Sequence, residues 1–425
     1  MPTKNQTDLL SNLPCLHVLR ASGLAVDPKK MLIGGLALCV LILGDGLIAR
    51  LPFAPESEVP ASVLQSEYLQ APGWLKEVGD TAQWSVRCFH TGITLLISPV
   101  RSVLEPGLLI MRSGSSWQDL AWAWTRLLWA LLVWSLAGGA IARMAALQFA
   151  QKRRISISQA VRFAGRQFLG YLTAPFLPLA GILCLLGFMA LDSWLASLIP
   201  VAGDYIISAF WIVAIFFGFL MAMMLTGFTV GWPLMISAIS TEDSDGFDGL
   251  SRAIGFWFDR PWYAFGLIVL SIPVFVLAWA LVSFLIGTTL YLAAWGVSAG
   301  AGSSGPPLFD AVANTPMLEN LWWNGWLNES PASKSSLDTL PTAFVIVWTY
   351  IPAVLLAGFG PSFFWCATTV IYFLLRESDD GTALTEVADW RQSDQPAADE
   401  PAAGGPGDST SSGGDVADTP PEAAE

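Results

Sequence analysis

Charged side chains are scarce in this sequence. Asp, Glu, Lys and Arg together make up 13% of the 425 residues, whereas soluble domains contain about 25%. Hydrophobic residues make up 54%, the mean hydropathy is +0.55, and the apolar residues gather in runs of about 20 or more. The composition therefore predicts an integral membrane protein of all-α class.

Basic residues are also fewer than acidic ones, and the formal net charge is −13. Proteins that bind nucleic acid need basic patches to contact the phosphates. We therefore expect no nucleic-acid partner.

Metal ligands are few. The two histidines are His17 and His90, and the five cysteines stand apart from one another, with no CxxC pair. Isolated cysteines in or beside apolar runs are typical of small buried hydrophobic residues, so we expect no metal site and no cofactor. The cysteines are Cys15, Cys39, Cys88, Cys184 and Cys366.

No catalytic motif stands out. His90, Asp80 and Glu105 share one loop of the predicted topology, but their spacing matches no arrangement of nucleophile and base. We therefore expect no catalytic residues and a non-enzymatic protein.

Six apolar runs are long enough to cross a membrane. They cover residues 31–51, 120–141, 171–191, 205–239, 262–297 and 341–375. The sequence thus predicts a polar N-terminal segment over 1–30, without the apolar core of a signal peptide. A transmembrane domain over 31–375 follows, and then an acidic tail over 376–425 that we expect to be disordered.

The segment over 84–111 is apolar but contains Pro99 and Pro106. Prolines break helices, so we expect an interfacial or re-entrant segment here rather than a span. Trp322, Trp323 and Trp326 lie in a later Gly-rich and Pro-rich loop, where an interfacial anchor is favoured over a ligand cage.

Two ionisable residues lie near the ends of predicted spans. Asp45 is near the far end of the first span and Arg126 is in the first turns of the second. We expect Asp45 to reach the membrane interface and Arg126 to extend outward along its aliphatic stem. In the sixth run, Gly358, Gly360 and Pro361 fit either an ordinary span or a broken helix at a binding site.

A basic segment and an amphipathic helix follow the second span. Lys152, Arg153 and Arg154 come first, and Ser156 and Gln159 then have the spacing of a capping box. The next residues predict a short helix with one apolar and one polar face. The apolar face is Ile157, Ala160, Val161, Ala164 and Phe168, and the polar face is Gln159, Arg162 and Arg166.

A shift of 90 residues aligns this helix with a second one. The pairs are Ile157 with Phe247, Ala160 with Leu250, Arg162 with Arg252, Ala164 with Ile254, Gly165 with Gly255 and Phe168 with Phe258. We interpret this as an internal repeat of span, surface helix and span, with chance similarity as the alternative. The second helix follows Glu242, Asp243 and Asp245, which could attract the basic residues 152–154.

The positive charges sort by predicted side. Fourteen of the 21 Lys and Arg residues flank the same ends of the spans. The bias predicts that both termini are cytoplasmic.

Two stretches resemble a known family. The segments RRISISQAVRFAGRQFLGYLTAPFLPLAG and GWPLMISAISTEDSDGFDGLSRAIGFWFDRPWYAF are similar to uncharacterised multi-span inner-membrane proteins of planctomycete-type bacteria. The resemblance covers about residues 120–290. It implies a location in a bacterial inner membrane and carries over no functional residues.

The resulting hypothesis is a membrane protein whose two cytoplasmic surface helices contact lipid headgroups or membrane or cytoplasmic protein partners. The alternative is a transporter or channel for a small neutral solute. The candidate contact residues are Lys152, Arg153, Arg154, Arg162, Arg166, Arg252 and Arg260.

Overall fold

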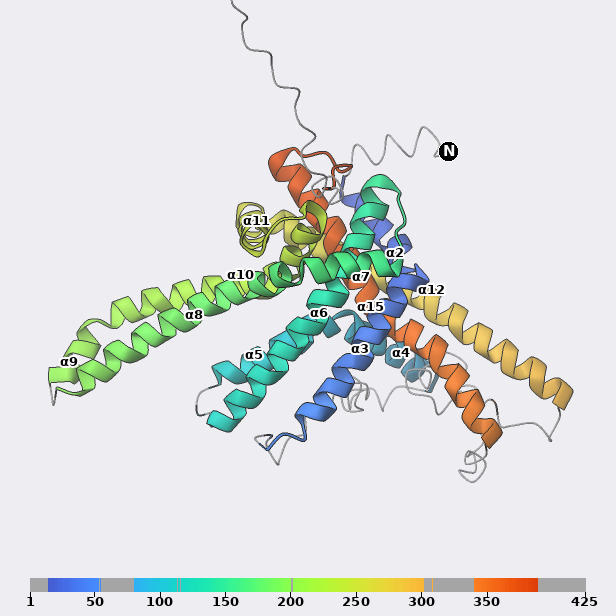
Figure 1. The fold of residues 1–425 in the computed structure, drawn as a ribbon, viewed down its shortest axis with the longest axis horizontal. Coiled ribbons are helices and arrows are strands. Elements are labelled where there is room, and N and C mark those ends of the chain that lie inside the picture. Colours follow the sequence, from blue (N-terminus) through green and yellow to red (C-terminus); the bar gives the residue numbers. More distant parts are fainter. Residues whose placement is uncertain are drawn as a thin grey trace, which may run out of the picture. The chain divides into compact units, whose positions relative to one another are not determined.

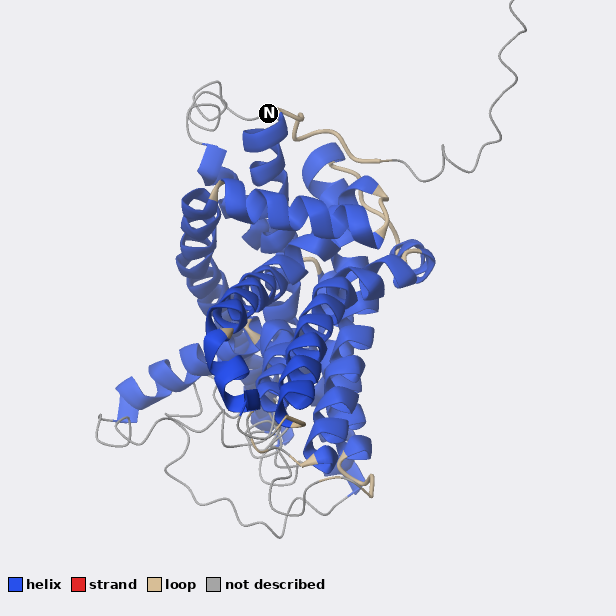
Figure 2. Cartoon of the chain, turned by 90° about the vertical axis from the view of Figure 1, so that its left-hand side faces the viewer, coloured by secondary structure: helices blue, strands red, loops and turns tan. Residues whose placement is uncertain are grey.

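The structure is a computed structural model of the chain. It describes residues 14–52, 54, 80–112, 114, 116–199, 202–301, 308 and 340–388. These residues are mostly helical and include no strand (Figure 2). The predicted tryptophan cluster 322–326 and residues 389–425 of the predicted tail lie outside the described residues.

Six long apolar helices dominate the fold, and each is long and apolar enough to cross a membrane. They are α3 (Pro28–Ile48), α6 (Trp117–Gln151), α8 (Phe168–Ser197), α10 (Trp211–Glu242), α12 (Pro261–Ala301) and α15 (Leu340–Asp380). The chain is therefore an all-α, multi-pass membrane protein, as its composition predicts.

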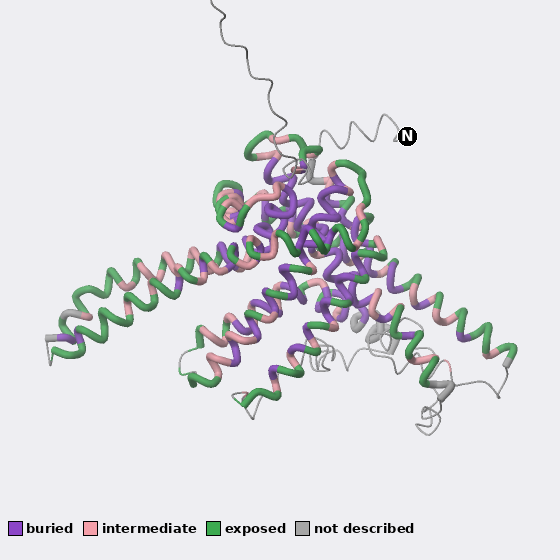
Figure 3. Tube along the Cα trace, viewed as in Figure 1, coloured by how far each residue is buried: buried purple, intermediate pink, exposed green. Residues whose placement is uncertain are grey.

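Shorter helices connect these six or lie beside them. They are η1 (Pro14–Val18), α2 (Leu19–Ala25), α4 (Asp80–Leu96), α5 (Ser98–Met111), α7 (Ile157–Arg166), α9 (Ala202–Ala209) and α11 (Gly246–Asp259). The long helices diverge from a shared buried region (Figure 1), and their far parts are largely exposed (Figure 3). In a membrane protein these apolar exposed parts face lipid.

Helix ends follow local chemistry more closely than hydropathy. The first span begins at Pro28, because Asp27 caps the helix and proline suits its first position. The helix ends at Ile48, shortly before the predicted end of the first span at residue 51. Helix α6 continues to Gln151 through good helix formers, beyond the predicted end of the second span at 141.

The predicted fourth run is interrupted near its start. Phe210 separates α9 from α10, so residues 205–239 are not one helix. Farther along, α10 passes through Pro233 without a break and ends at Glu242.

The segment predicted to be interfacial or re-entrant forms α4 and α5. The two helices are bent by 68° at the break between Leu96 and Ser98. Pro99 lies in the first turn of α5, where proline is well tolerated. Pro106 lies inside α5, so the prediction that it breaks the segment is wrong.

The backbones of α15 and α3 are in close contact where the two helices cross. A Cβ added at Gly358 would lie 1.9 Å from the carbonyl oxygen of Met31, and one at Gly35 would lie 2.3 Å from that of Val354. Helix α15 is one helix through Pro361. The broken-helix alternative for this run is therefore wrong, and Gly358 serves close helix packing.

The face of α6 that carries small residues is buried against other helices. A Cβ added at Gly138 would lie 2.6 Å from the Trp365 ring, and Ala142 and Ala146 are fully buried. Beside it, Gly139 leaves room for the ring of Tyr171 on α8. Small residues on one helix thus receive large aromatic residues from two others.

The order of long helix, short helix and long helix occurs twice. Helices α6 and α10 both end at a residue with a left-handed backbone, Lys152 with φ 54° and Asp243 with φ 55°. Asp243 lies 91 positions after Lys152, and α12 begins 93 positions after α8. At the latter shift, the buried Ala160 and Phe163 align with the buried Ala253 and Phe256. The internal repeat stays a prediction.

We predict that Gly358→Ala lowers the stability of the protein. The added methyl group meets the α3 backbone, which cannot rotate away, and overpacking of this kind costs about 1–3 kcal/mol. Thermal unfolding in detergent would measure the change. Gly266→Ala on α12 is the matched control, since its Cβ would meet nothing within 4 Å; an equal loss in both variants would contradict the close crossing.

Candidate functional site

The ends of the long helices that share one face of the fold meet in a layer of polar side chains. We call this set the polar layer, and it consists of Lys30, Arg143, Gln148, Gln167, Tyr171, Ser240, Glu242, Asp243, Arg252, Tyr372 and Arg376. It joins the start of α3 and α8 to the end of α6, α10 and α15. Ionisable groups inside an apolar membrane protein often mark a functional site, so the polar layer is the first candidate site.

Glu242, the last residue of α10, is the central carboxylate of the polar layer. It accepts a hydrogen bond of 2.6 Å from the Tyr372 hydroxyl and one of 3.2 Å from Nη1 of Arg376. Its other oxygen lies 2.9 Å from Nε of Arg252 on α11. The Glu242 side chain is 13% exposed and that of Arg376 is 4% exposed. One partly buried carboxylate therefore links α10, α11 and α15.

Arg252 stays charged in this setting. Burial lowers the pKa of its guanidinium, but the negative charges of Glu242 and Asp248 outweigh burial and raise the pKa above its ordinary value. The arginine is therefore a permanent cation held beside Glu242, although its side chain is 37% exposed.

Arg143 is the second buried centre of the polar layer. It lies two turns before the end of α6 and is 1% exposed. It donates hydrogen bonds of 2.8 Å to the carbonyl of Ser240 and 2.7 Å to the carbonyl of Ala388. Its guanidinium also lies 4.3 Å from the ring centre of Phe163 on α7. One arginine thus holds α6, α7, α10 and the segment after α15 together.

The contact with Ala388 corrects the predicted start of the tail. Helix α15 extends to Asp380, and the backbone N–H of Ala388 donates to the carbonyl of Thr241. Arg376 further binds the carbonyl of Glu386 at 2.6 Å. Residues 376–388 are therefore part of the packed structure, although their composition predicts disorder.

Three contacts attach α7, α8 and the residue between them to α10 or its C-terminal cap. The hydroxyl groups of Tyr171 and Ser240 are 2.8 Å apart and both residues are fully buried. Asp243 accepts from the Gln167 side chain at 2.5 Å and lies 3.8 Å from Arg166. The predicted attraction between 152–154 and the acidic residues is therefore wrong in its partners, because α7's C-terminal end meets Asp243 instead.

Lys30 extends the polar layer to the N-terminal part of the chain. Its ammonium group is fully buried and donates to the carbonyl of Leu24 at 2.8 Å and to the side chain of Gln148 at 2.7 Å. Nearby, the Ser362 hydroxyl on α15 donates to the carbonyl of Ala25. The predicted polar segment 1–30 is thus partly a packed element of the fold.

The predicted capping box and amphipathic helix are confirmed in α7. The Ser156 side chain accepts from the Gln159 backbone, and the Gln159 side chain accepts from the Ser156 backbone. The predicted apolar face is right only in part. Ala160 and Ala164 are buried together with Phe163, whereas Val161 is 47% exposed and Phe168 begins α8. Phe163 packs against Arg143, whose guanidinium lies over the ring in a cation–π contact.

The seven predicted contact residues fall into two groups. Lys152, Arg153, Arg154 and Arg162 are exposed, and none makes an ion pair with another described residue. We call these four residues the basic surface.

The other three predicted contact residues have acidic partners. Arg166 pairs with Asp243, Arg252 with Glu242, and Arg260 with Asp379. Sequence alone gave little signal for this division, because Asp243, Glu242 and Asp379 lie outside the helices of the arginines that they contact, and only Asp248 shares a helix with its partner Arg252.

A second group of charges lies on α3, α5 and α6. Arg126 is 6% exposed, lies 3.3 Å from Asp45 and stacks on Trp122. The prediction that Arg126 extends outward is therefore wrong, because Asp45 gives it a partner inside the protein. On α5, Arg101 pairs with Glu105 one turn later.

Among the described part of the chain, no group of three His, Cys, Asp or Glu side chains is close enough to hold a metal. Cys88 and Cys366 are buried, as expected, but Cys184 is exposed on α8. The described geometry thus offers charge and hydrogen bonding rather than metal ligation.

Comparison with known proteins gives no match. No family model, no curated protein and no solved structure matches the chain.

We predict that Glu242→Gln destabilises the fold. The amide keeps the shape but leaves two arginines without their shared carboxylate, and each hydrogen bond to a charged group contributes about 1.5–3 kcal/mol. Chemical or thermal unfolding in detergent would measure the loss.

Asp248→Asn is the matched control for Glu242→Gln. Asp248 pairs with the same Arg252 but is 44% exposed, and exposed pairs of this kind contribute about 0–1 kcal/mol. A loss as large in the control as in Glu242→Gln would show that Glu242 holds no special place in the polar layer.

Proposed function

We propose that the chain is a non-enzymatic integral protein of a bacterial inner membrane whose basic surface binds anionic lipid headgroups on the cytoplasmic side. The observation that carries the proposal is the division of the arginines. Four basic residues remain exposed and without an ionic partner in the described structure, although acidic residues are abundant in the chain.

The position of the basic surface supports this assignment. Lys152, Arg153 and Arg154 directly follow the long apolar helix α6. Clusters of basic residues beside a span attract anionic lipid headgroups, and each contributes about 1 kcal/mol near the membrane surface. The same positive charges indicate the cytoplasmic side by the positive-inside rule.

The outer side of α7 has the same character. Arg162 is exposed beside Val161, and Leu169 at the start of α8 is 71% exposed. A surface that mixes cations with exposed apolar side chains suits the boundary between headgroups and acyl chains. Helix α7 therefore serves as a rigid support, with its inner face fixed on α6 and its outer face turned to the lipid.

We predict that Arg162→Gln weakens binding of phosphatidylglycerol to the purified protein about fivefold, which corresponds to the loss of one cation near a membrane surface. Neutralising all four residues of the basic surface should weaken binding further. Native mass spectrometry with phosphatidylglycerol and phosphatidylcholine at equal concentration would measure the difference.

Arg260→Gln provides the matched control for this prediction. Arg260 is also exposed, at 49%, but Asp379 lies 3.8 Å from it. Its loss should change phosphatidylglycerol binding little. Equal binding by wild-type protein and the four-residue variant would refute the proposed lipid contact.

A transporter of a small neutral solute is the second candidate function. Buried ionisable groups in membrane helices often mark a pathway, and Asp45 with Arg126 forms such a pair beside the bent α4–α5 segment. The charges of Asp45, Arg101, Glu105 and Arg126 cancel, which suits a solute without net charge.

For the transporter candidate, we predict that proteoliposomes take up glycerol or urea and that Asp45→Asn lowers the flux at least tenfold. The reason is that Arg126 then carries an uncompensated charge beside the pathway. Asp192→Asn, on the exposed end of α8, is the matched control. Protein-free liposomes with the same permeability as the wild-type sample would eliminate this candidate.

A further inference from the structure

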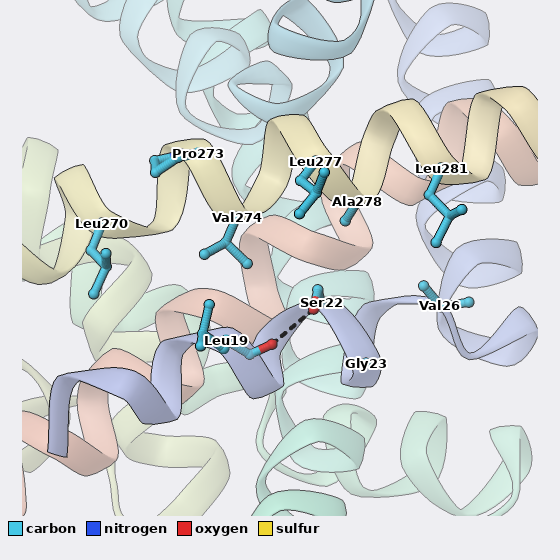
Figure 4. A pocket seen from close by; sticks show the side chains of 10 residues that line it. All are labelled: Leu19, Ser22, Gly23, Val26, Leu270, Pro273, Val274, Leu277, Ala278 and Leu281. Carbon is cyan, nitrogen blue, oxygen red and sulfur yellow. Dashed lines mark hydrogen bonds between the residues drawn. The ribbon is translucent and has the colours of Figure 1, made fainter. Parts of the chain in front are cut away.

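An apolar groove separates α2 from α12. It encloses about 740 Å³, which lies within the range of small-molecule sites of about 300–1,000 Å³. The lining residues are Leu19, Ser22, Gly23 and Val26 of α2 and Leu270, Pro273, Val274, Leu277, Ala278 and Leu281 of α12 (Figure 4).

The groove offers nothing to a polar ligand. Ser22 supplies its one side-chain hydroxyl, and that group already donates to the carbonyl of Leu19 at 2.8 Å. Water in a protein cavity needs two to four polar partners, so an apolar cavity of this kind is a poor site for it. The occupant that fits this lining is a hydrocarbon.

The groove is open to the side of α12 that faces lipid. Val274 and Ala278 form its floor and are 9% exposed, whereas Leu277 is 75% and Leu281 is 67% exposed at its rim. Helix α12 is one of the six membrane-spanning helices. The groove is therefore continuous with a surface that acyl chains already cover, and a chain can enter it from the bilayer.

The length of the groove is comparable to that of one acyl chain. Leu270 and Leu281 are 11 residues apart, which is about 16 Å along a helix, and the hydrocarbon core of a bilayer is about 30 Å thick for two leaflets. Leu19 lies across from the Leu270 end and Val26 across from the Leu281 end. The groove thus accommodates one acyl chain along its length.

Cations lie at both ends of α2. Arg20 follows Leu19 directly, and Lys29 comes shortly after Val26. Both side chains are exposed, and neither makes an ion pair with another described residue. An anionic phosphate at the membrane surface would complement these charges.

We propose that this groove binds one acyl chain of an anionic phospholipid, with the phosphate held near Arg20 or Lys29. The site is separate from the basic surface on α7 and does not depend on it. The lipid would fill the space between α2 and α12 and so fix the N-terminal helix against the membrane domain.

Gly23 allows a direct test. A Cβ added at Gly23 would meet nothing within 4 Å, so Gly23→Leu fills the groove without a backbone clash. Gly266→Leu is the matched control. Gly266 is on α12, the other helix of the groove, but it does not line the groove, and a Cβ added there would also meet nothing within 4 Å. Thermal unfolding of both variants confirms that they fold.

The probe is phosphatidylglycerol with a photoreactive group in one acyl chain, added to the purified full-length protein in detergent. We expect cross-links to concentrate on residues 19–26 and 270–281, to fall at least fivefold in Gly23→Leu and to persist in Gly266→Leu. Equal yields in wild-type and Gly23→Leu protein, or cross-links spread evenly over α8 and α10, would overturn the site. An equal yield with the phosphatidylcholine analogue would overturn its anionic character.

Discussion

The partly buried carboxylate of Glu242, the last residue of α10, joins three helices. It binds Tyr372 and Arg376 of α15 and Arg252 of α11. Charges inside an apolar protein are unfavourable unless they are paired, so each of these residues restricts where the others can lie. Arg143 extends the same constraint to α6 and to the segment after α15.

The remainder of the fold follows from this arrangement and from close backbone contact. Glycines let α15 and α3 cross with their backbones in van der Waals contact. Dispersion and close packing stabilise such crossings in membranes. Beyond the buried region, the long helices separate and expose apolar side chains (Figure 3). A membrane surrounds these parts, so they need no protein partner to be stable.

The sequence predicted what local chemistry decides. The six apolar runs follow from hydropathy, and the capping box of Ser156 and Gln159 follows from residues three positions apart. It failed where distant residues meet. Arg126 contacts Asp45, which lies 81 positions away in the sequence. Arg252 pairs with Glu242, whereas Arg162, its predicted equivalent, is exposed. Composition could not show that residues 381–388 pack, because the packing depends on hydrogen bonds that Arg143 and Arg376 donate to backbone carbonyls of this segment.

The polar layer joins the ends of α6, α10 and α15 and so places them on one face of the membrane. Labelling of single cysteines by a membrane-impermeant thiol reagent in intact and inverted vesicles tests it most directly. Cysteines at Lys152, Asp245 and Asp380 should react from one side, and those at Arg50, Trp117 and Leu198 from the other. Reaction of the Lys152 and Asp380 variants from opposite sides would contradict the placement of these helix ends on one face of the membrane.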